Sequence, residues 1–342
     1  MSEDAYISVI IPVHNGEAHL DECLRALSCC GEGFEVIVID DGSTDDSARI
    51  ARRHSRVKLL QLAARGGPAA ARNHGARQAR SDVLLFIDAD VRVRPDTVKR
   101  VTDHFRLKPK LAALFGSYDD SPASTRFVSQ YKNLFHHFTH QQARPQAETF
   151  WAGCGAVRRE VFMHLGGFDE QCYREPSIED IELGYRLRRA LYPVLLDKQL
   201  QVQHLKAWTL TSLLRADIFR RAVPWSRLML ERGALSRDLN LRVGERVSAL
   251  ATVSALALLA LSLASTYLLA PASLLLMLVF ILNRKMYYFF MRRMGPLSLP
   301  GVAALHLLYY CYSSAAFALC CMAHAFSGRK RAAAVERLEA LH

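Results

Sequence analysis

The stretch from Val83 to Asp90 constrains the fold most, because five apolar residues run directly into two carboxylates separated by one alanine. An uninterrupted apolar run is typical of a strand that is buried on both faces of a parallel sheet. Sheets of this kind bind ligands just beyond the carboxyl ends of their strands. Carboxylates are costly to bury without a partner, and Mg²⁺ or Mn²⁺ is a natural one because both prefer oxygen ligands. Taken alone, Asp88-Ala89-Asp90 also fits a solvated turn or a helix cap.

Strand-like and helix-like segments alternate along the first hundred residues. Helical spacing, capping residues and turn signals separate the apolar runs. This order predicts an α/β fold with a doubly wound, mostly parallel sheet. The predicted strands are residues 6–11, 34–39, 57–62 and 83–87, followed by shorter ones near 111–115, 148–151 and 194–203, with a helix over about 178–190.

Two further strand ends carry polar residues. Pro12, Val13, His14, Asn15 and Glu17 follow the first predicted strand, and Asp40 and Asp41 end the second. A carboxylate there can hydrogen-bond a nucleobase or a ribose hydroxyl, although a plain turn with a helix cap explains the same residues. Neither a G-x-G-x-x-G nor a P-loop pattern occurs, so a Rossmann dinucleotide site and a P-loop are not supported.

The C-terminal part is dominated by apolar residues. Val247–Leu269 carries no charge over 23 residues and is long enough to span a bilayer. A shorter apolar run, 272–282, is followed by the basic and aromatic segment 284–293, which is typical of a membrane interface. Residues 297–326 are long enough to span again. Two spans and three spans, with a tight hairpin first, both remain open, and so does the side of the C-terminus.

The formal net charge of +11 indicates an anionic partner. No nucleic-acid motif is present, so we expect no nucleic acid and an anionic membrane surface instead. The N-terminal residues Met1-Ser2-Glu3-Asp4 are acidic and do not open a secretory signal. We therefore expect the acid-rich N-terminal part on the cytoplasmic side of an inner or plasma membrane.

Taken in order, these segments resemble a family-2 glycosyltransferase with the GT-A fold over about residues 1–205. The matching motifs are quite specific as a series. They are Val9-Ile10-Ile11-Pro12-Val13-His14-Asn15, Asp40-Asp41-Gly42-Ser43-Thr44-Asp45, Ala71-Arg72-Asn73, Phe86-Ile87-Asp88-Ala89-Asp90, Gly166-Gly167-Phe168-Asp169 and Glu179-Asp180.

The resemblance implies a role for each matching residue. Donor-binding residues would be Pro12, Val13, His14, Asn15, Glu17, Asp40, Asp41, Arg72, Asp88 and Ala89. Asp90 would be the main ligand of a divalent Mn²⁺ or Mg²⁺, with Asp88 and His204 as further metal ligands. Asp180, beside Glu179, would be the catalytic base, and Gly153, Arg221 and Trp225 would lie on the diphosphate or acceptor side.

Simpler interpretations stand beside three of these roles. His204 is also compatible with a structural histidine, and Arg72 with a solvent-facing cation. Arg221 and Trp225 faintly resemble the arginine and tryptophan motif of processive synthases, but they also suit a basic amphipathic helix on anionic lipid.

Asp180 can be assigned from the residues themselves as well. Ser177 precedes it by three positions, close to the capping pattern of a helix start. The dipole at a helix N-terminus favours a carboxylate in its charged form. Such a carboxylate could accept a proton from an acceptor hydroxyl, although it could also serve only to complement the dipole.

The sequence thus predicts a membrane-bound, inverting, nucleotide-sugar-dependent hexosyltransferase of the cell envelope that acts with a divalent metal on a lipid, lipid-linked or glycan acceptor. Alternatives are a processive polysaccharide synthase and a catalytically inactive, membrane-anchored nucleotide-binding scaffold. The donor, the acceptor and the oligomeric state stay open. The expected segments are the catalytic domain 1–205, amphipathic juxtamembrane helices 206–246, the membrane region 247–326 and a basic tail 327–342.

Overall fold

The computed structural model describes residues 7–232 and 242–339, with side chains through residue 326. The chain divides into two compact units, Met1–Leu213 and Leu214–His342. The finer division at residues 205, 246 and 326 stays a prediction. Tyr6 of the first predicted strand, the acidic N-terminus and the side chains of the basic tail lie outside the described residues.

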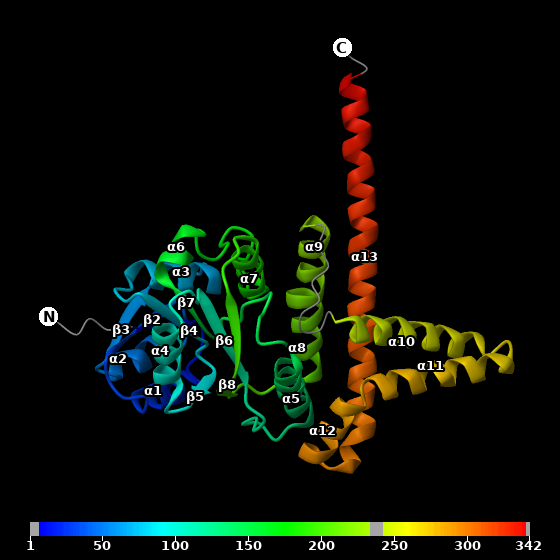
Figure 1. Ribbon diagram of the computed structural model, residues 1–342, viewed down its shortest axis with the longest axis horizontal. Coiled ribbons are helices and arrows are strands. Elements are labelled where there is room, and N and C mark those ends of the chain that lie inside the picture. The colour runs from blue at the N-terminus through cyan, green and yellow to red at the C-terminus, as the bar shows by residue number, and fades with distance from the viewer. Residues whose placement is uncertain (1–6, 233–241, 340–342) are drawn as a thin grey trace. The chain divides into compact units, whose positions relative to one another are not determined.

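The first unit is built on one mixed sheet of eight strands, in the order β3-β2-β1-β4-β7-β6-β8-β5 (Figure 1). Helices accompany the sheet, which confirms the α/β class. The strands are β1 Ile7–Val13, β2 Phe34–Asp40, β3 Val57–Gln61, β4 Val83–Ile87, β5 Val91–Val93, β6 Ala113–Tyr118, β7 Cys154–Arg158 and β8 Val194–His204. The helices are α1 Leu20–Ser28, α2 Ser47–Arg53, α3 Pro68–Gln78, α4 Thr97–Leu107, α5 Phe127–Gln142, α6 Arg159–His164 and α7 Glu179–Arg189.

The first four strands are parallel, as predicted, and all of β4 is buried. Chain order reverses between β3 and β4, so β1 and β4 lie side by side with their carboxyl ends at the same edge. Parallel sheets bind ligands at this kind of switch point. The loops after β1 and β4 therefore meet where a ligand is expected.

Beyond β4 the sheet is mixed, because β7 runs antiparallel between β4 and β6. The predicted strand at 148–151 was wrong, and the strand begins at Cys154. Its first residues are small, with weak strand preference. Small residues are needed there, since a Cβ on Gly155 would lie 2.2 Å from the carbonyl oxygen of Trp151.

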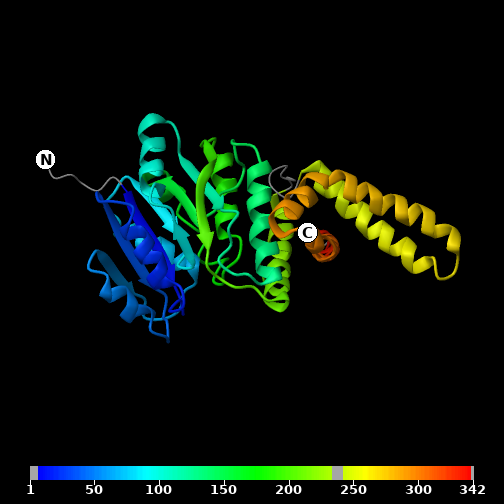
Figure 2. The same cartoon turned by 90° about the horizontal axis from the view of Figure 1, so that it is seen from below.

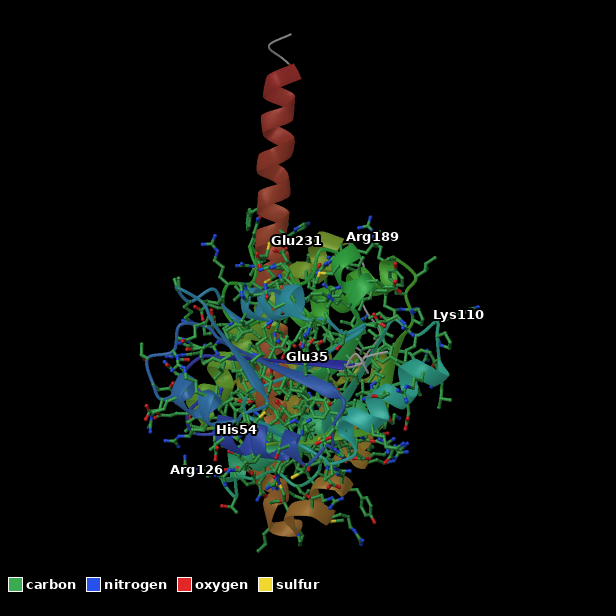
Figure 3. The ribbon with its side chains drawn as sticks, turned by 90° about the vertical axis from the view of Figure 1, so that its left-hand side faces the viewer. Glu35, His54, Lys110, Arg126, Arg189 and Glu231 are labelled. Carbon is green, nitrogen blue, oxygen red and sulfur yellow. The ribbon has the colours of Figure 1, made fainter. Side chains whose placement is uncertain are left out.

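A polar cluster ties the strands together at the amino ends, opposite the carboxyl ends. Glu35 of β2, labelled in Figure 3, accepts hydrogen bonds from the Ser8 hydroxyl and from the Arg80 amide. The Ser8 hydroxyl also accepts from the Ser81 amide at 3.2 Å. These bonds join β1, β2 and the approach to β4, so they support the register that aligns the strand ends.

Helix α7 packs backbone to backbone on the loop that precedes β7. A Cβ on Gly184 would lie 2.3 Å from the Phe150 nitrogen and 2.4 Å from the Thr149 carbonyl carbon. Real side chains do not approach backbone so closely. Gly184 thus sets the distance between α7, which begins at Glu179, and the 149–153 loop.

We predict that Gly184→Ala lowers the free energy of unfolding by about 1–3 kcal/mol, because the backbone of the loop must shift. Gly244→Ala is the matched control. Gly244 is also helical, and a Cβ added there would have no atom within 4 Å, so alanine there should raise helix stability by about 0.5–1 kcal/mol. Thermal unfolding of both variants in detergent measures the difference, and equal melting temperatures would contradict it.

The second unit is entirely helical within the described residues. Its helices are the end of α8 Leu210–Arg215, the π-helix η1 Ala216–Ala222, α9 Val223–Arg232, α10 Val243–Leu261, the 3-10 turn η3 Thr266–Leu268, α11 Leu269–Leu282, α12 Arg284–Met294, the 3-10 turn η4 Pro296–Ser298 and α13 Leu299–Glu339. By length and composition, Val243–Leu261 and Pro296–Phe326 could each cross a membrane. The pair formed by Thr266–Leu282 and Arg284–Met294, bent by 67°, would be a third crossing if it is one broken span.

Helices α10 and α11 form a tight hairpin, which is one of the two arrangements that the sequence left open (Figures 1 and 2). The expected first span, 247–269, was wrong in one respect, because the helix ends at Leu261 and the turn falls inside the apolar run. The Ser262 hydroxyl donates to the Leu259 carbonyl at 2.7 Å, a local bond that competes with helix continuation. Pro271 does not end a helix; it lies in the first turn of α11, where its missing N–H costs little.

A buried polar network joins three segments of this unit. The Tyr310 hydroxyl lies 2.7 Å from Glu245 Oε2 and 3.2 Å from Asn283 Oδ1. Asn283 Nδ2 donates to the Ser248 hydroxyl and to the Val279 carbonyl, each at 2.9 Å. Asn283 therefore adds a side-chain bond at the end of α11 and joins α10 to α13 through Ser248 and Tyr310.

We predict that Tyr310→Phe destabilises the helical unit by roughly 0.6–1.7 kcal/mol, the range for buried polar contacts between membrane helices. Tyr267→Phe is the control, because Tyr267 is 89% exposed. Thermal unfolding in detergent should show a lower midpoint for Tyr310→Phe alone. An unchanged midpoint would show that the network adds no net stability.

Candidate functional site

The loops after β1 and β2 are bonded to each other through several polar groups. The Asn15 amide donates to the Ser43 hydroxyl at 3.0 Å, and Asn15 Oδ1 accepts from the Thr44 amide at 2.8 Å. Farther along, Glu17 and Asp45 accept from backbone amides of the opposite loop. Asn15 has a φ of 52°, a left-handed conformation that asparagine tolerates. The two loops form one polar rim.

Asp40 and Asp41 lie buried beneath this rim. Asp40 accepts from the Ser43 amide and from Gln61 Nε2. The two oxygens of Asp41 accept from the amides of Gly66 and Gly67, at 2.6 and 2.8 Å. Asp41 thus holds the turn that leads into α3. His14 Nδ1 donates to the Asp41 carbonyl at 2.8 Å, and the His14 ring is exposed at this polar rim.

Arg72 of α3 is the cation at the centre of the site, with a side chain only 6% exposed. Its Nη2 donates to Asp88 Oδ1 at 2.7 Å, and its Nη1 donates to Glu179 Oε1 at 2.8 Å. Burial opposes the charge of Arg72, but Asp88 and Glu179 outweigh it and raise its pKa. Arg72 is therefore not the solvent-facing cation that one interpretation allowed; it joins β4 to α7.

The two carboxylates after β4 differ in character. Burial raises the pKa of Asp88; Arg72 opposes that rise and Asp90 adds to it. The pKa of Asp90 is lowered, because His204 and Lys206 outweigh the effect of burial. The surroundings of Asp90 thus favour its charged form, and those of Asp88 oppose it.

His204 ends β8 and lies buried beside Asp90. Its Nε2 is 3.5 Å from Asp90 Oδ2, and its Nδ1 donates to Asn133 Oδ1 at 2.8 Å. The ring stacks on Tyr118, with centroids 4.5 Å apart. Sequence reasoning missed Asn133 and Tyr118, since neither follows a recognisable motif and both depend on how α5 and β6 pack.

Asp180, at the start of α7, is half-buried and bonded to the loop before β7. Its Oδ2 accepts from the Ala152 amide at 3.1 Å, and its Oδ1 accepts from its neighbour Ile181. Gly153 lies against the Trp151 ring, since a Cβ there would come within 2.4 Å of it. The Gly153 carbonyl accepts from the Asp88 amide at 3.2 Å. Gly153 therefore lies between Trp151 and Asp88 rather than offering a side chain.

The structure brings most of the predicted residues to one edge of the sheet. Arg72 contacts Asp88 and Glu179, its pKa also responds to Asp180, and His204 lies beside Asp90. Arg221 and Trp225 lie in the other unit, on η1 and α9. There the same segment packs on α13, and the Tyr312 hydroxyl donates to Asp217 at 2.8 Å. Their roles stay predictions.

The donor set near Asp90 suits a divalent ion that is shared with a substrate. Across residues 7–232 and 242–326, no group of three or more His, Cys, Asp or Glu side chains is placed to hold a metal by itself. Mg²⁺ is commonly held by one or two carboxylates and completed by substrate phosphates. Asp90, with Asp88 and His204 next to it, matches that pattern.

A mixed sheet of this order, with carboxylates at the ends of β2 and β4, is a GT-A-like fold. Residues 8–166 match the family described as Glycosyl transferase family 2, so the chain carries a glycosyltransferase family 2 domain. The structure superposes on a mannosyltransferase from Pyrobaculum calidifontis in complex with GDP-Man and Mn²⁺, with a TM-score of 0.56, 17% identity and coverage of 91% of this chain and 86% of that one. At this identity the likeness shows the fold alone.

Other matches agree with this classification. S. aureus TarS 1–349 in complex with UDP-GlcNAc superposes with a TM-score of 0.50, 19% identity and 89% coverage of each chain. An undecaprenyl-phosphate 4-deoxy-4-formamido-L-arabinose transferase of Pseudomonas aeruginosa is 36% identical over 200 residues, which are 55% of this chain and 52% of that protein. The chain spans about half the length of the curated relatives it matches.

We predict that Arg72→Leu lowers the free energy of unfolding by about 3–5 kcal/mol, because it leaves Asp88 and Glu179 without their buried cation. Arg77→Leu is the matched control, since Arg77 lies on the same helix but is exposed. The free energy of unfolding of Arg72→Lys should lie between those of the wild type and Arg72→Leu, because a lysine ammonium cannot bond two carboxylates in the way a planar guanidinium does. Denaturant unfolding monitored by tryptophan fluorescence measures all three. Stability of Arg72→Leu within about 1 kcal/mol of Arg77→Leu, a margin near the net worth of one ordinary hydrogen bond, would argue against the bridging role.

Proposed function

We propose that the chain transfers a sugar from a nucleotide-sugar donor to a lipid, lipid-linked or glycan acceptor at a membrane, with inversion at the anomeric carbon. One observation carries the proposal: Arg72 joins Asp88, at the end of β4, to the helix start that bears Asp180, and Asp90 follows two residues after Asp88. The family match over residues 8–166 supports the reaction class.

The rim formed by the loops after β1 and β2 would bind the nucleoside. Pro12, Val13, His14, Asn15 and Glu17 belong to its first side, and Asp40 and Asp41 to its second. In this proposal the ligand meets the exposed part of the rim, because the Asp41 carboxylate is already bonded to Gly66 and Gly67. Asp88 and Ala89 lie at the neighbouring strand end, toward the diphosphate.

Asp90, with Asp88 and His204, would hold Mn²⁺ or Mg²⁺ at the diphosphate. Such an ion neutralises the charge that develops on the departing nucleoside diphosphate. The mannosyltransferase complex, which contains Mn²⁺, supports a divalent ion in this fold. Asp90 is suited to the role because its pKa is lowered and it stays a carboxylate.

Asp180 would act as the base for a hydroxyl acceptor. As the acceptor oxygen attacks the anomeric carbon, its proton passes to Asp180 and the nucleoside diphosphate leaves with the bonding electrons. Glu179 is held by Arg72 and would fix the helix start rather than take the proton. A phosphate acceptor would already be ionised, so Asp180 would matter less for it.

A lipid acceptor is favoured by two observations. The curated relative from Pseudomonas aeruginosa is named for undecaprenyl phosphate, and two helices of this chain are apolar enough to cross a membrane. We place the chain at the inner or plasma membrane, with the catalytic unit on the cytoplasmic side. Arg221 and Trp225, on helices next to the apolar region, would face the diphosphate or acceptor.

The test uses the full chain in detergent with UDP-, GDP- and dTDP-sugars, Mn²⁺ or Mg²⁺, and either undecaprenyl phosphate or a native lipid extract as acceptor. Release of the nucleoside diphosphate is measured together with product formation. Asp90→Asn should lower turnover with every acceptor. Asp180→Asn should lower it by about 10²–10⁴-fold with a hydroxyl acceptor and only slightly with undecaprenyl phosphate.

Asp103→Asn is the control, because Asp103 is an exposed carboxylate that pairs with Lys99 on α4, and it should match the wild type. Turnover that survives both Asp90→Asn and Asp180→Asn would refute the site assignment. Donor binding without release by the folded wild type would favour the inactive scaffold, and products longer than one added sugar would favour a processive synthase.

A further inference from the structure

We propose that Asn133 is a positioning residue for the metal site: it holds the Nδ1–H of His204, so that Nε2 is the nitrogen that faces Asp90 and can bind the ion. This inference rests on the proposed function, since it concerns the ion that Asp90 would hold. It assigns a role to a residue of α5, a helix that contains none of the sequence motifs.

The geometry joins two elements that are far apart in the chain. Asn133 lies in the middle of α5 and His204 ends β8, yet Asn133 Oδ1 and His204 Nδ1 are 2.8 Å apart. Asn133 is 1% exposed and His204 is 3% exposed. Because water has little access to either group, the amide oxygen decides where the imidazole carries its proton.

The proton position follows from the chemistry of the two side chains. An amide oxygen only accepts hydrogen bonds, and a neutral imidazole carries one N–H. With Nδ1–H donated to Asn133, Nε2 is left to face Asp90 Oδ2 at 3.5 Å. A proton on Nε2 points at that carboxylate, and an ion bound there would release this proton to solvent and take up the lone pair of Nε2. A metal-binding histidine commonly donates its other N–H to an oxygen in this way, which fixes its tautomer and its orientation.

The ring is also held from its face. Tyr118 of β6 stacks on His204 at 4.5 Å with an interplanar angle of 23°. Asn133 holds the edge of the ring and Tyr118 holds one face, so Nε2 can point only along the direction of Asp90. A ligand in that position is preorganised before the ion arrives.

The Asn133 amide costs stability, and the bond from its oxygen to His204 explains why an amide stands there. Asn133 Nδ2 is buried and has no hydrogen-bond partner among the described residues. An unpaired buried donor costs roughly 1–3 kcal/mol, which an apolar residue of similar size would avoid. The oxygen, and not the whole amide, is therefore the group that the site uses.

The test measures Mn²⁺ binding to the full chain in detergent, with UDP or GDP present, from the electron paramagnetic resonance signal of free Mn²⁺. Asn133→Leu, which has no acceptor, should weaken Mn²⁺ binding by about 10–100-fold. Asn133→Asp, which keeps the acceptor oxygen, should bind at least as tightly as the wild type. Weaker binding by Asn133→Asp, or unchanged binding by Asn133→Leu, would overturn the proposal, so either variant decides if the other fails to fold.

Ser129→Ala is the matched control, because Ser129 lies on the same helix, is fully buried and bonds the Trp208 backbone rather than His204. It should lower the melting temperature and leave Mn²⁺ affinity unchanged. A spectroscopic readout separates positioning from general destabilisation: electron spin echo modulation from a histidine nitrogen should accompany bound Mn²⁺ in the wild type, in Ser129→Ala and in Asn133→Asp, and should vanish in His204→Ala.

The outcomes also distinguish failure of this inference from failure of the proposed function on which it rests. Mn²⁺ that binds without any histidine nitrogen signal would overturn the role of Asn133 and leave metal-assisted transfer intact. A wild-type chain that binds no Mn²⁺ with either nucleotide would overturn both the positioning role and the metal-assisted mechanism.

Discussion

The buried guanidinium of Arg72 is the interaction on which the rest of the site depends. It comes from α3 and is shared by Asp88, at the end of β4, and Glu179, at the start of α7. One cation thereby fixes a sheet end relative to the start of a helix that lies far along the chain, since Arg72 and Glu179 are 107 residues apart. Its charge also allows these two carboxylates to lie close together, where repulsion would otherwise separate them.

The parts of the fold that follow from local pattern were predictable from the sequence. The four parallel strands and the start of α7 coincide with apolar periodicity, and the carboxylates at the strand ends lie where an open sheet binds ligands. Strand β7 was not predictable in this way. Its Gly155 is required by the close approach of the Trp151 carbonyl and not by strand preference, so only the packed structure explains it.

Contacts between distant segments account for what the sequence left open. The position of Arg72 in the sequence does not show that its guanidinium bonds two carboxylates. No motif marks Asn133 as the partner of His204. The break at Leu261 was hidden for a local reason: the Ser262 hydroxyl bonds the Leu259 carbonyl, and an apolar run predicts length but not where such a bond competes with the helix. Each of these features depends on hydrogen bonds whose partners are set by the folded structure.

Gly184 has a consequence for how this protein could be redesigned. Helix α7 is seated by contact between its own backbone and the backbone of Thr149 and Phe150, so no side chain at that contact sets the position of Asp180. Asp180, at the start of the same helix, can therefore keep its place while neighbouring side chains are exchanged for others. Under the proposed function, acceptor preference could then be varied without moving Asp180, provided that position 184 remains without a side chain.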